Sequence, residues 1–316
     1  MILEQPTWKI KDSSKLSDWL DCPRMYFFRH MLGWRVDRPN HDAYFGESWH
    51  KAREYQLLHG YHELEGAYSA FIEHYRKEFP QDTDVLYTPK DPTAAMLALQ
   101  QIAQQYPHDL DDNKVLYTEI SGTVPVDQKG RVLHYRMDSV IERADGKIFS
   151  WDHKSAKRFS RQWAENFFLS IQTGTYTHCM YCMYPIDQVI GIEYCGTAFE
   201  YMKRTQEYRI SFQRVPAWKT PDQMNVWLWL VNVLLDDIER ETNNLMNYCT
   251  EDDTVLMAFP LNPNSCSKYW GCAYHDYCMS WSNPLRYCYE SPLGFKQEFW
   301  NPSLMETTNK INLEWR

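Results

Sequence analysis

The sequence lacks an apolar run long enough to cross a bilayer, which takes about 20 consecutive, mostly apolar residues. Its first residues, Met1-Ile2-Leu3-Glu4, do not form the basic start and apolar core of a secretory signal. Internal repeats, low-complexity tracts and the Gly-x-x-x-x-Gly-Lys-Ser/Thr pattern of P-loop ATPases are also absent. We therefore expect a cytoplasmic protein that does not bind membranes and carries no P-loop motor of its own.

An excess of positive charge is missing as well. The 316 residues include 33 Lys and Arg against 42 Asp and Glu, a formal net charge of −9. This balance argues against a globally basic nucleic-acid binder, so any contact with phosphates must use local patches. Hydrophobic residues make up 44% and aromatic residues 16%, which predicts a folded chain with a large core in one elaborated domain or two.

The nine cysteines are an odd number, and no secretion signal accompanies them. Disulfide frameworks belong to oxidising compartments, so we do not expect one here. Metal ligation or simple burial is the expected fate of these thiols.

A predicted β-hairpin carries the clearest chemical pattern. Tyr135–Glu142 alternates as a half-buried strand does, and Lys147–His153 follows as a second strand. Asp145-Gly146 between them is a typical two-residue hairpin turn. Asp138 lies in the first strand and Asp152 near the end of the second, so the hairpin brings two carboxylates together.

Lys154 completes this group, because residues two apart in a strand point to the same face as Asp152 does. Two adjacent carboxylates repel each other unless a cation lies between them, and oxygen ligands favour Mg²⁺ or Mn²⁺. A lysine beside such a metal can orient a water molecule or stabilise a developing phosphorane charge. The alternative is a solvated hairpin with ordinary surface charges, since Asp-x-Lys is common.

The following segment, Ser160–Tyr184, is predicted to be one helix. Gln172 and Tyr176 are four residues apart and share one face of it. Cys179 and Cys182 lie in its apolar part, so we expect them to be packed in the core rather than to form a redox or zinc pair.

The hairpin and the helix after it contain three motifs in chain order: Met137-Asp138, Trp151-Asp152-His153-Lys154 and Gln172-Thr173-Gly174-Thr175-Tyr176. With them the chain resembles the PD-(D/E)XK nuclease superfamily, specifically its RecB-type branch. The resemblance implies metal-dependent hydrolysis of DNA, with Gln172 and Tyr176 positioning Lys154 or the substrate backbone. The family often has glycine two positions before the first aspartate, whereas this chain has Arg136, which puts the local strand geometry in doubt.

The resemblance extends toward the N-terminus. Gly46-x-x-x-His50 matches a family pattern at the start of a helix, which implies that His50 binds the metal or contacts the substrate. Neutral imidazole suits Mn²⁺ better than Mg²⁺. The His153 carbonyl is a further implied ligand. Glu119 falls where the family often has a glutamate on the first core strand, and it either supports the metal site from outside or is an exposed strand residue.

Local basic clusters are candidates for contact with DNA. Lys157, Arg158 and Arg161 follow directly after the metal-binding motif, a position that suits backbone phosphates. Arg24 belongs to a Cys-Pro-Arg motif that the family shares, inside a helical stretch expected to begin at Lys15 with Ser13 or Ser14 as its cap. Solvated loop and helix faces are the alternatives.

A cysteine-rich stretch near the C-terminus is the second strong feature. Cys266, Cys272 and Cys278 stand at intervals of six residues in a segment without helix or strand periodicity. The stretch resembles the iron–sulfur closure of a subset of RecB-type nucleases, including CRISPR-associated members and some exonucleases. That likeness implies a 4Fe–4S cluster held by these three cysteines and Cys22. The usual first gap is two residues rather than five, and His275 keeps a Cys/His zinc site open. Packed thiols without metal are the third reading.

We therefore predict an α/β protein with a mixed central sheet flanked by helices, a restriction-endonuclease-like core. Its parts are an N-terminal helix with the first motif (1–50), a helical insert (51–112), the nuclease core (113–215), and a C-terminal helix with a cysteine-rich closure (216–316). The predicted activity is a single-strand DNA exonuclease, with a helicase or recombination protein as partner. The alternative is a non-catalytic DNA-binding or assembly subunit of the same fold.

Overall fold

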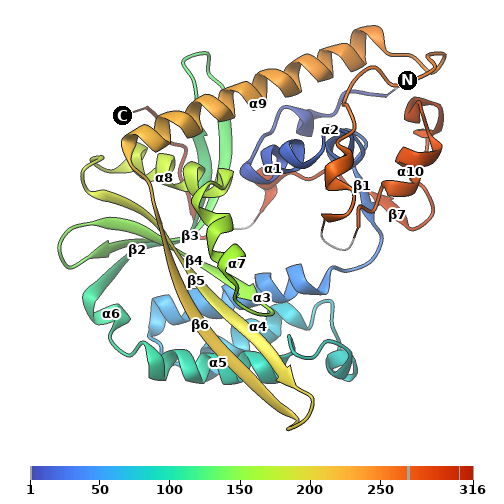
Figure 1. The fold of residues 1–316 in the computed structure, drawn as a ribbon. Helices are drawn as coiled ribbons and strands as arrows, with labels where there is room; N and C mark the ends of the chain where they lie inside the picture. The colour runs from blue at the N-terminus through green and yellow to red at the C-terminus, as the bar shows by residue number, and fades with distance from the viewer. Residues whose placement is uncertain (1, 269–270, 306, 316) are drawn as a thin grey trace. The chain divides into compact units, whose positions relative to one another are not determined.

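A computed structural model describes residues 2–268, 271–305 and 307–315 of the chain, with the elements labelled in Figure 1. The chain folds into two compact units, each assembled from separated segments. The first unit is Met1–Arg38, Thr123–Tyr135 and Pro221–Met305, and the second is Pro39–Gly122, Arg136–Thr220 and Glu306–Arg316. Within the described ranges, no helix is both long and apolar enough to cross a membrane.

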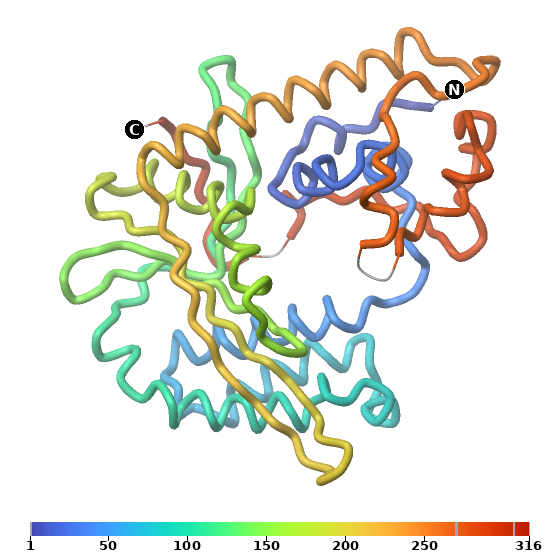
Figure 2. Tube along the Cα trace, in the orientation of Figure 1, coloured from blue at the N-terminus to red at the C-terminus, as the bar shows by residue number. Residues whose placement is uncertain are grey.

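A six-stranded sheet with the order β6-β5-β4-β3-β2-β8 organises the second unit. Its strands are β2 (Asn113–Pro125), β3 (Val132–Arg143), β4 (Ile148–Ala156), β5 (Val189–Met202), β6 (Glu207–Trp218) and β8 (Asn309–Lys310). The β3–β4 and β5–β6 pairs are antiparallel, and the β4–β5 and β2–β8 pairs are parallel. The predicted mixed sheet is thus confirmed, and β5 and β6 form the long yellow hairpin in Figure 2.

Helices flank this sheet, as the predicted α/β class requires. They are α3 (His41–His59), α4 (Leu64–Tyr75), the short 3₁₀ helix η3 (Gln81–Leu86), α5 (Pro92–Gln105), α6 (Asp109–Asp112), α7 (Arg161–Phe168) and α8 (Ile171–Met183). Figure 1 shows α3, α4 and α5 gathered along one side of the sheet. Aromatic side chains from these helices, among them Phe45, Trp49 and Phe71, form a buried core with Phe149 and Trp151 of β4.

The alternation along β4 separates this core from polar chemistry. Because successive side chains point to opposite faces, Asp152 and Lys154 face away from the side on which Trp151 packs. Helix α8 lies against β4 and β5. Its Thr173 hydroxyl is 2.7 Å from the hydroxyl of Tyr194 on β5. Strand β4 therefore directs Trp151 and His153 to one face of the sheet and Asp152 and Lys154 to the other.

The single helix predicted over Ser160–Tyr184 is wrong, because the chain forms α7 and α8 with a break between them. Helix α7 ends at Phe168 with Leu169 as its C-cap, and Ser170 caps α8, its side chain accepting a hydrogen bond from Thr173 N at 3.1 Å. A serine with this local bond favours a helix start over a helix interior.

The first unit holds the N-terminal and C-terminal elements. They are η1 (Pro6–Trp8), α1 (Ser13–Asp21), α2 (Pro23–Tyr26), the π-helical turn η2 (Phe27–Met31), β1 (Trp34–Val36), α9 (Pro221–Tyr248), η4 (Pro263–Ser265), α10 (His275–Ser280), η6 (Pro284–Tyr287), β7 (Phe295–Gln297) and η7 (Pro302–Leu304). Strands β1 and β7 pair antiparallel.

The cap of helix α1 is Asp12, so the serines predicted for that role are wrong. The Asp12 side chain accepts a hydrogen bond from Lys15 N at 2.8 Å. Aspartate is as good a cap as serine, and the sequence Asp-Ser-Ser offers three equivalent choices.

Candidate functional site

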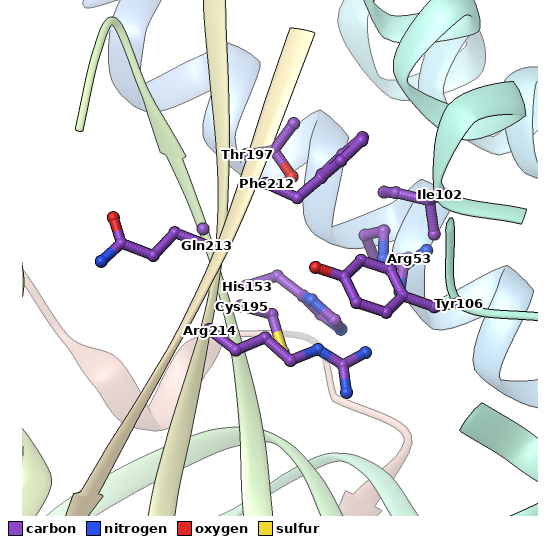
Figure 3. Close-up of a pocket in the computed structure, with 10 residues that line it drawn as sticks. Arg53, Ile102, Tyr106, His153, Cys195, Thr197, Phe212, Gln213 and Arg214 are labelled. Carbon is purple, nitrogen blue, oxygen red and sulfur yellow. The ribbon is translucent and has the colours of Figure 1, made fainter. Parts of the chain in front are cut away.

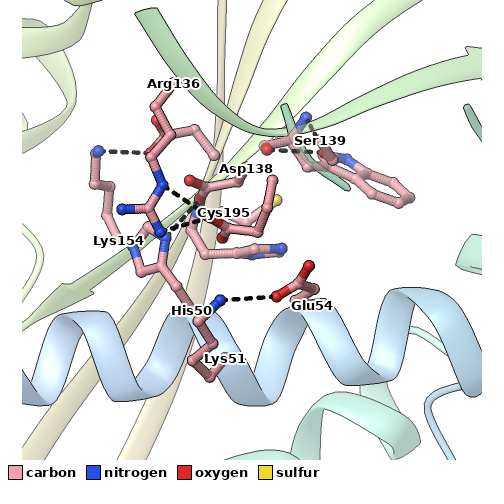
Figure 4. A network of polar contacts seen from close by, with 12 residues as sticks. His50, Lys51, Glu54, Arg136, Asp138, Ser139, Lys154 and Cys195 are labelled. Atoms are coloured by element: carbon pink, nitrogen blue, oxygen red, sulfur yellow. Dashed lines mark hydrogen bonds and ion pairs between the residues drawn. The ribbon is translucent and has the colours of Figure 1, made fainter. Parts of the chain in front are cut away.

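The predicted pair of carboxylates lies on neighbouring strands, Asp138 on β3 and Asp152 on β4. The main-chain N–H of His153 donates a hydrogen bond to Asp138 Oδ2 at 2.8 Å. His50 Nδ1 lies 3.0 Å from the same oxygen, reaching it from helix α3 (Figure 4). Asp138 is therefore held by both a strand and a helix.

Glu119 of strand β2 joins this pair. Ligand atoms of His50, Glu119 and Asp138 all lie within 4.8 Å of one another. One imidazole nitrogen and two carboxylates form a donor set that suits Mn²⁺ or Mg²⁺. The Glu119 side chain is 1% exposed, so it is not the exposed strand residue that one sequence reading allowed. Its backbone φ of 43° is in the left-handed region, which costs energy for a non-glycine residue and is common at functional sites.

Arg136 pairs with Glu119 rather than disturbing the strand. Its Nε donates to Glu119 Oε2 at 2.8 Å, and β3 continues without interruption through this position. The arginine that departs from the family pattern thus supplies a positive partner for a buried carboxylate.

Asp152 is the most telling residue of the site. Its carboxylate is 1% exposed, and Lys154 Nζ lies 2.7 Å from Oδ1 as an ion pair. Among the described residues, Lys154 is the only group within ion-pairing distance of this carboxylate, and Oδ2 has no hydrogen-bond partner. A buried carboxylate oxygen without a partner is costly unless a cation compensates it, so this group also fits a metal.

The two aspartates have opposite pKa shifts. Burial raises the pKa of Asp152 to about 6, because the attraction of Lys154 does not fully compensate the loss of water. Burial acts in the same direction on Asp138, but His50 and Lys154 hold the pKa of Asp138 below its ordinary value. For Lys154, burial is outweighed by Asp152 and Asp138, which keep the pKa of this ammonium above its usual range.

Gln172 and Tyr176 meet on helix α8 as their spacing predicts. Gln172 Nε2 donates a hydrogen bond to the Tyr176 hydroxyl at 2.9 Å. Tyr176 is buried, and its pKa is raised well above the ordinary value by burial and by the nearby charges of Asp152 and Asp138. The tyrosine therefore stays protonated beside the carboxylates and can donate a hydrogen bond there.

The family is decided by comparison with known proteins. A family model described as the PD-(D/E)XK nuclease superfamily matches residues 13–279. The chain belongs to this superfamily. Membership supports a metal-dependent nuclease, a hydrolase that acts on DNA.

Other comparisons add little to that assignment. No curated protein matches the chain. A solved structure described as "Crystal structure of SSO0001" is 12% identical over 76% of this chain and 94% of that chain, with a TM-score of 0.27.

The basic residues predicted to contact DNA divide into two groups in this PD-(D/E)XK protein. Lys157, Arg158 and Arg161 are exposed just after β4 and at the start of α7. Arg24 is buried, and its Nε donates to the Phe259 carbonyl at 2.9 Å. We therefore remove Arg24 from the DNA-binding set, because its guanidinium is committed to main-chain oxygens inside the first unit.

The four cysteines singled out in the sequence line one cavity of about 20 Å³ in the first unit. Cys22 comes from the end of α1, while Cys266, Cys272 and Cys278 come from the C-terminal stretch, and His275 also contributes to the wall. Burial raises the pKa of Cys278 to about 12, and the other three sulfurs add to this. Gathering four thiols without a cation therefore disfavours their ionised form.

The spacing of these sulfurs is wider than that of the carboxylate site. No three of them, within the described part of the chain, lie within 4.8 Å of one another. Thiolates bound tetrahedrally to one zinc ion at about 2.3 Å would be ~3.8 Å apart. The thiols thus converge, but not to the distance of a single zinc ion.

Proposed function

We propose that this protein cleaves DNA by metal-dependent hydrolysis at the buried site on strands β2, β3 and β4. The proposed ligands for one or two divalent cations are His50, Glu119, Asp138 and Asp152, with the His153 carbonyl as a further oxygen. The observation that carries the proposal is Asp152, a buried carboxylate that is paired with the Lys154 ammonium through Oδ1 while its Oδ2 has no hydrogen-bond partner among the described residues. A bound Mg²⁺ or Mn²⁺ would supply Lewis acidity and lower the pKa of a bound water.

Lys154 is the side chain that we propose takes part in the hydrolysis alongside the metal. Its ammonium pairs with Asp152, and the charges of Asp152 and Asp138 raise its pKa and keep it charged, so it can orient an attacking water or stabilise negative charge on the phosphorus centre. Tyr194 lies on its other side, with the ammonium 5.7 Å from the ring centre. Gln172 and Tyr176 then act as positioning residues that hold Lys154 or the substrate backbone from helix α8.

For the substrate, we propose single-stranded DNA entered from an end, as in RecB-type exonucleases. The motif set supports this branch, and the exposed Lys157, Arg158 and Arg161 supply positive charge for phosphates next to the site. The chain has no P-loop motif, so we expect a separate helicase or recombination protein to deliver the strand.

For the second metal centre, we propose a 4Fe–4S cluster bound by Cys22, Cys266, Cys272 and Cys278. The support is that all four thiols line one cavity and are spread more widely than zinc ligation requires. Zinc bound with His275 as one ligand is the alternative, and metal analysis distinguishes the two.

The test of the activity is incubation with end-labelled single- and double-stranded DNA in Mg²⁺, Mn²⁺ or EDTA. We expect mononucleotides or short products from single-stranded DNA with either metal and none in EDTA. Cleavage of closed circular single strands would replace the exonuclease proposal with an endonuclease. DNA binding without cleavage under every metal condition would favour the non-catalytic subunit instead.

A further inference from the structure

A second cavity lies on the face of β4 opposite to Asp152 and Lys154, inside the second unit. It measures about 20 Å³, and its polar lining includes Arg53 of α3, His153 of β4 and Arg214 of β6. Apolar and weakly polar groups complete the wall, among them Tyr106, Cys195 and Phe212. Figure 3 shows the His153 imidazole and the Arg53 and Arg214 side chains converging there.

Arg53 brings a buried positive charge to this cavity. The residue is 3% exposed, its guanidinium donates a hydrogen bond to Gln56 Oε1, and it stacks 4.6 Å from the ring centre of Tyr61. Among the described residues, no carboxylate oxygen lies within 4.0 Å of it. A buried charge is stabilised by direct pairing, so the guanidinium of this arginine is free to take an anion as a direct partner.

The carboxylates nearby are already engaged by Arg214. Its Nη2 donates to Asp109 Oδ2, and its Nη1 lies 3.5 Å from Glu193 Oε2. Glu193 also accepts a hydrogen bond from Trp151 Nε1 at 2.7 Å. Both acids therefore contact Arg214, and neither lies within ion-pairing distance of Arg53.

Two further donors around the cavity have no partner. His153 is 2% exposed, and its Nε2 makes no hydrogen bond with the described residues. Arg214 Nε is likewise buried and without an acceptor among them. Cys195 does not supply the missing negative charge, because burial raises the pKa of its thiol well above the ordinary value.

We propose that this cavity binds one small monovalent anion of the halide class, held by Arg53, His153 and Arg214. The size of the cavity sets the class, because about 20 Å³ holds about one water-sized particle and excludes a phosphate group or a nucleotide. Nitrogen donors of Arg53, His153 and Arg214 with apolar walls suit a weakly hydrated anion, which can accept from all three at once. The site is independent of the proposed nuclease activity.

The position of the site gives the anion a structural consequence. His153 lies between Asp152 and Lys154 on β4. An anion bound to its imidazole therefore contacts the face of this strand that is opposite to the two site residues. Any ligand that binds only the folded state stabilises it by mass action. Halides are therefore expected to stabilise the protein without reaching the DNA-binding side.

The direct test is crystallography of the wild-type protein grown in sodium bromide, with data collected at the bromine absorption edge. We expect an anomalous peak inside the cavity, within hydrogen-bonding distance of Arg53 and His153. A peak of water height without anomalous signal at this place would overturn the proposal.

A solution test uses thermal unfolding in bromide at constant ionic strength, with methanesulfonate, which is too large for the cavity, as the balancing salt. We expect the midpoint to rise by about 2–4 °C for each tenfold increase in bromide above its dissociation constant. Arg53→Met should lose this rise. Arg209→Met, an exposed arginine on the same strand as Arg214, should keep it. Equal bromide dependence in all three proteins would contradict a site at Arg53, and the crystallographic test stands even if Arg53→Met does not fold.

Discussion

Asp138 and Asp152 share one buried site, yet their environments treat them differently. Asp138 accepts a hydrogen bond from the main-chain N–H of His153 and lies next to the imidazole of His50. Its negative charge is therefore already stabilised by the protein. Asp152 pairs with the Lys154 ammonium through Oδ1, and its Oδ2 has no hydrogen-bond partner among the described residues. Asp138 is therefore already held in place as a metal ligand. Asp152 is the carboxylate whose charge a bound cation would stabilise most.

His50 is predicted to act as a metal ligand rather than as a substrate contact. His50→Ala should weaken activity most at low metal concentration and recover in part with excess Mn²⁺, because the remaining carboxylates still hold the cation less tightly. Activity is measured against Mn²⁺ concentration, with the exposed His62→Ala as control. Equal loss at every metal concentration would assign His50 to substrate binding or folding.

At the residue scale, sequence spacing predicted contacts that are local and missed those that are not. The hairpin and the i, i+4 helix face were enough to bring Asp152 to Lys154 and Gln172 to Tyr176. The place of Glu119 beside Asp138 and Arg136 depends on the pairing of β2 with β3, which a single sequence does not reveal. Arg24 was misjudged because a basic residue in a helical pattern does not show which chain segment will cover it.

At the scale of helices and strands, the pairing of β8 with β2 is a feature that the sequence does not reveal. The chain returns near its end to lie beside β2, where Ile311 N donates to the Ser121 carbonyl at 2.7 Å. Strand β8 is only two residues long, too short to show the alternating pattern of a strand, so its pairing with β2 could not be predicted from the sequence. The hairpin of β3 and β4 could be predicted, because Tyr135–Glu142 alternates and Asp145-Gly146 is a typical hairpin turn.

Gly122 makes this approach of β8 feasible. A Cβ at this position would lie 1.8 Å from the Ile311 carbonyl oxygen, and the residue has a φ of +157°. Gly122→Ala should therefore displace residues 307–315 and cost about 1–3 kcal/mol of unfolding free energy, as overpacking does. Limited proteolysis should cut this segment faster than in the wild type.

The control for this prediction is Gly130→Ala, where a Cβ meets no atom within 4 Å but φ is also positive, at +90°. That variant carries the backbone strain without the collision. If protease cuts residues 307–315 at the same rate in both variants, the close packing of β8 on β2 is contradicted.

The segment leading into helix α1 contains a buried lysine whose charge should make stability depend on pH. Burial lowers the pKa of Lys11 to about 7, with Lys15 adding to the effect. Above pH 7 the unfolded chain binds a proton that the folded chain does not, so the free energy of unfolding rises with pH. The rise is at most about 1.4 kcal/mol per pH unit and should stop as pH approaches the ordinary lysine value.

This prediction is measured as a difference between variants, since the cysteines titrate in both proteins. Urea unfolding from pH 7 to 9 should show the wild type gaining stability relative to Lys11→Met. The exposed Lys9→Met should follow the wild type. Parallel curves for wild type and Lys11→Met would mean that Lys11 stays charged in the folded protein.

At the scale of the whole molecule, the first unit is built from segments far apart in the sequence. Cys22 and Cys266 are 244 residues apart yet line the same cavity. A shared metal centre would close a very long loop, and such closures constrain the unfolded chain most in the loop-entropy model. The resemblance to iron–sulfur nucleases implied this grouping, whereas the assembly of the unit from three segments had no signal in the sequence.

Loss of one of these thiols should damage folding more than chemistry. Cys272→Ser is expected to lower metal content and thermal stability, whereas Cys288→Ser, outside the cavity, should change neither. The measurement is metal and sulfide analysis of anaerobically prepared protein, with absorption near ~400 nm from thiolate-to-iron charge transfer. About four iron and four sulfide per chain support the 4Fe–4S cluster, stoichiometric zinc supports the Cys/His site, and no metal with a stable Cys272→Ser leaves packed thiols.

The central claim is that the buried site around Asp152 and Lys154 hydrolyses DNA with a divalent cation. Its most direct test is cleavage of end-labelled single-stranded DNA by purified Asp152→Ala and Lys154→Ala proteins, with circular dichroism to verify folding. The exposed variants Asp187→Ala and Lys203→Ala serve as matched controls. We predict no detectable cleavage by Asp152→Ala, a loss of at least about 100-fold for Lys154→Ala, and wild-type rates for both controls. Wild-type cleavage by a folded Asp152→Ala protein would contradict the account.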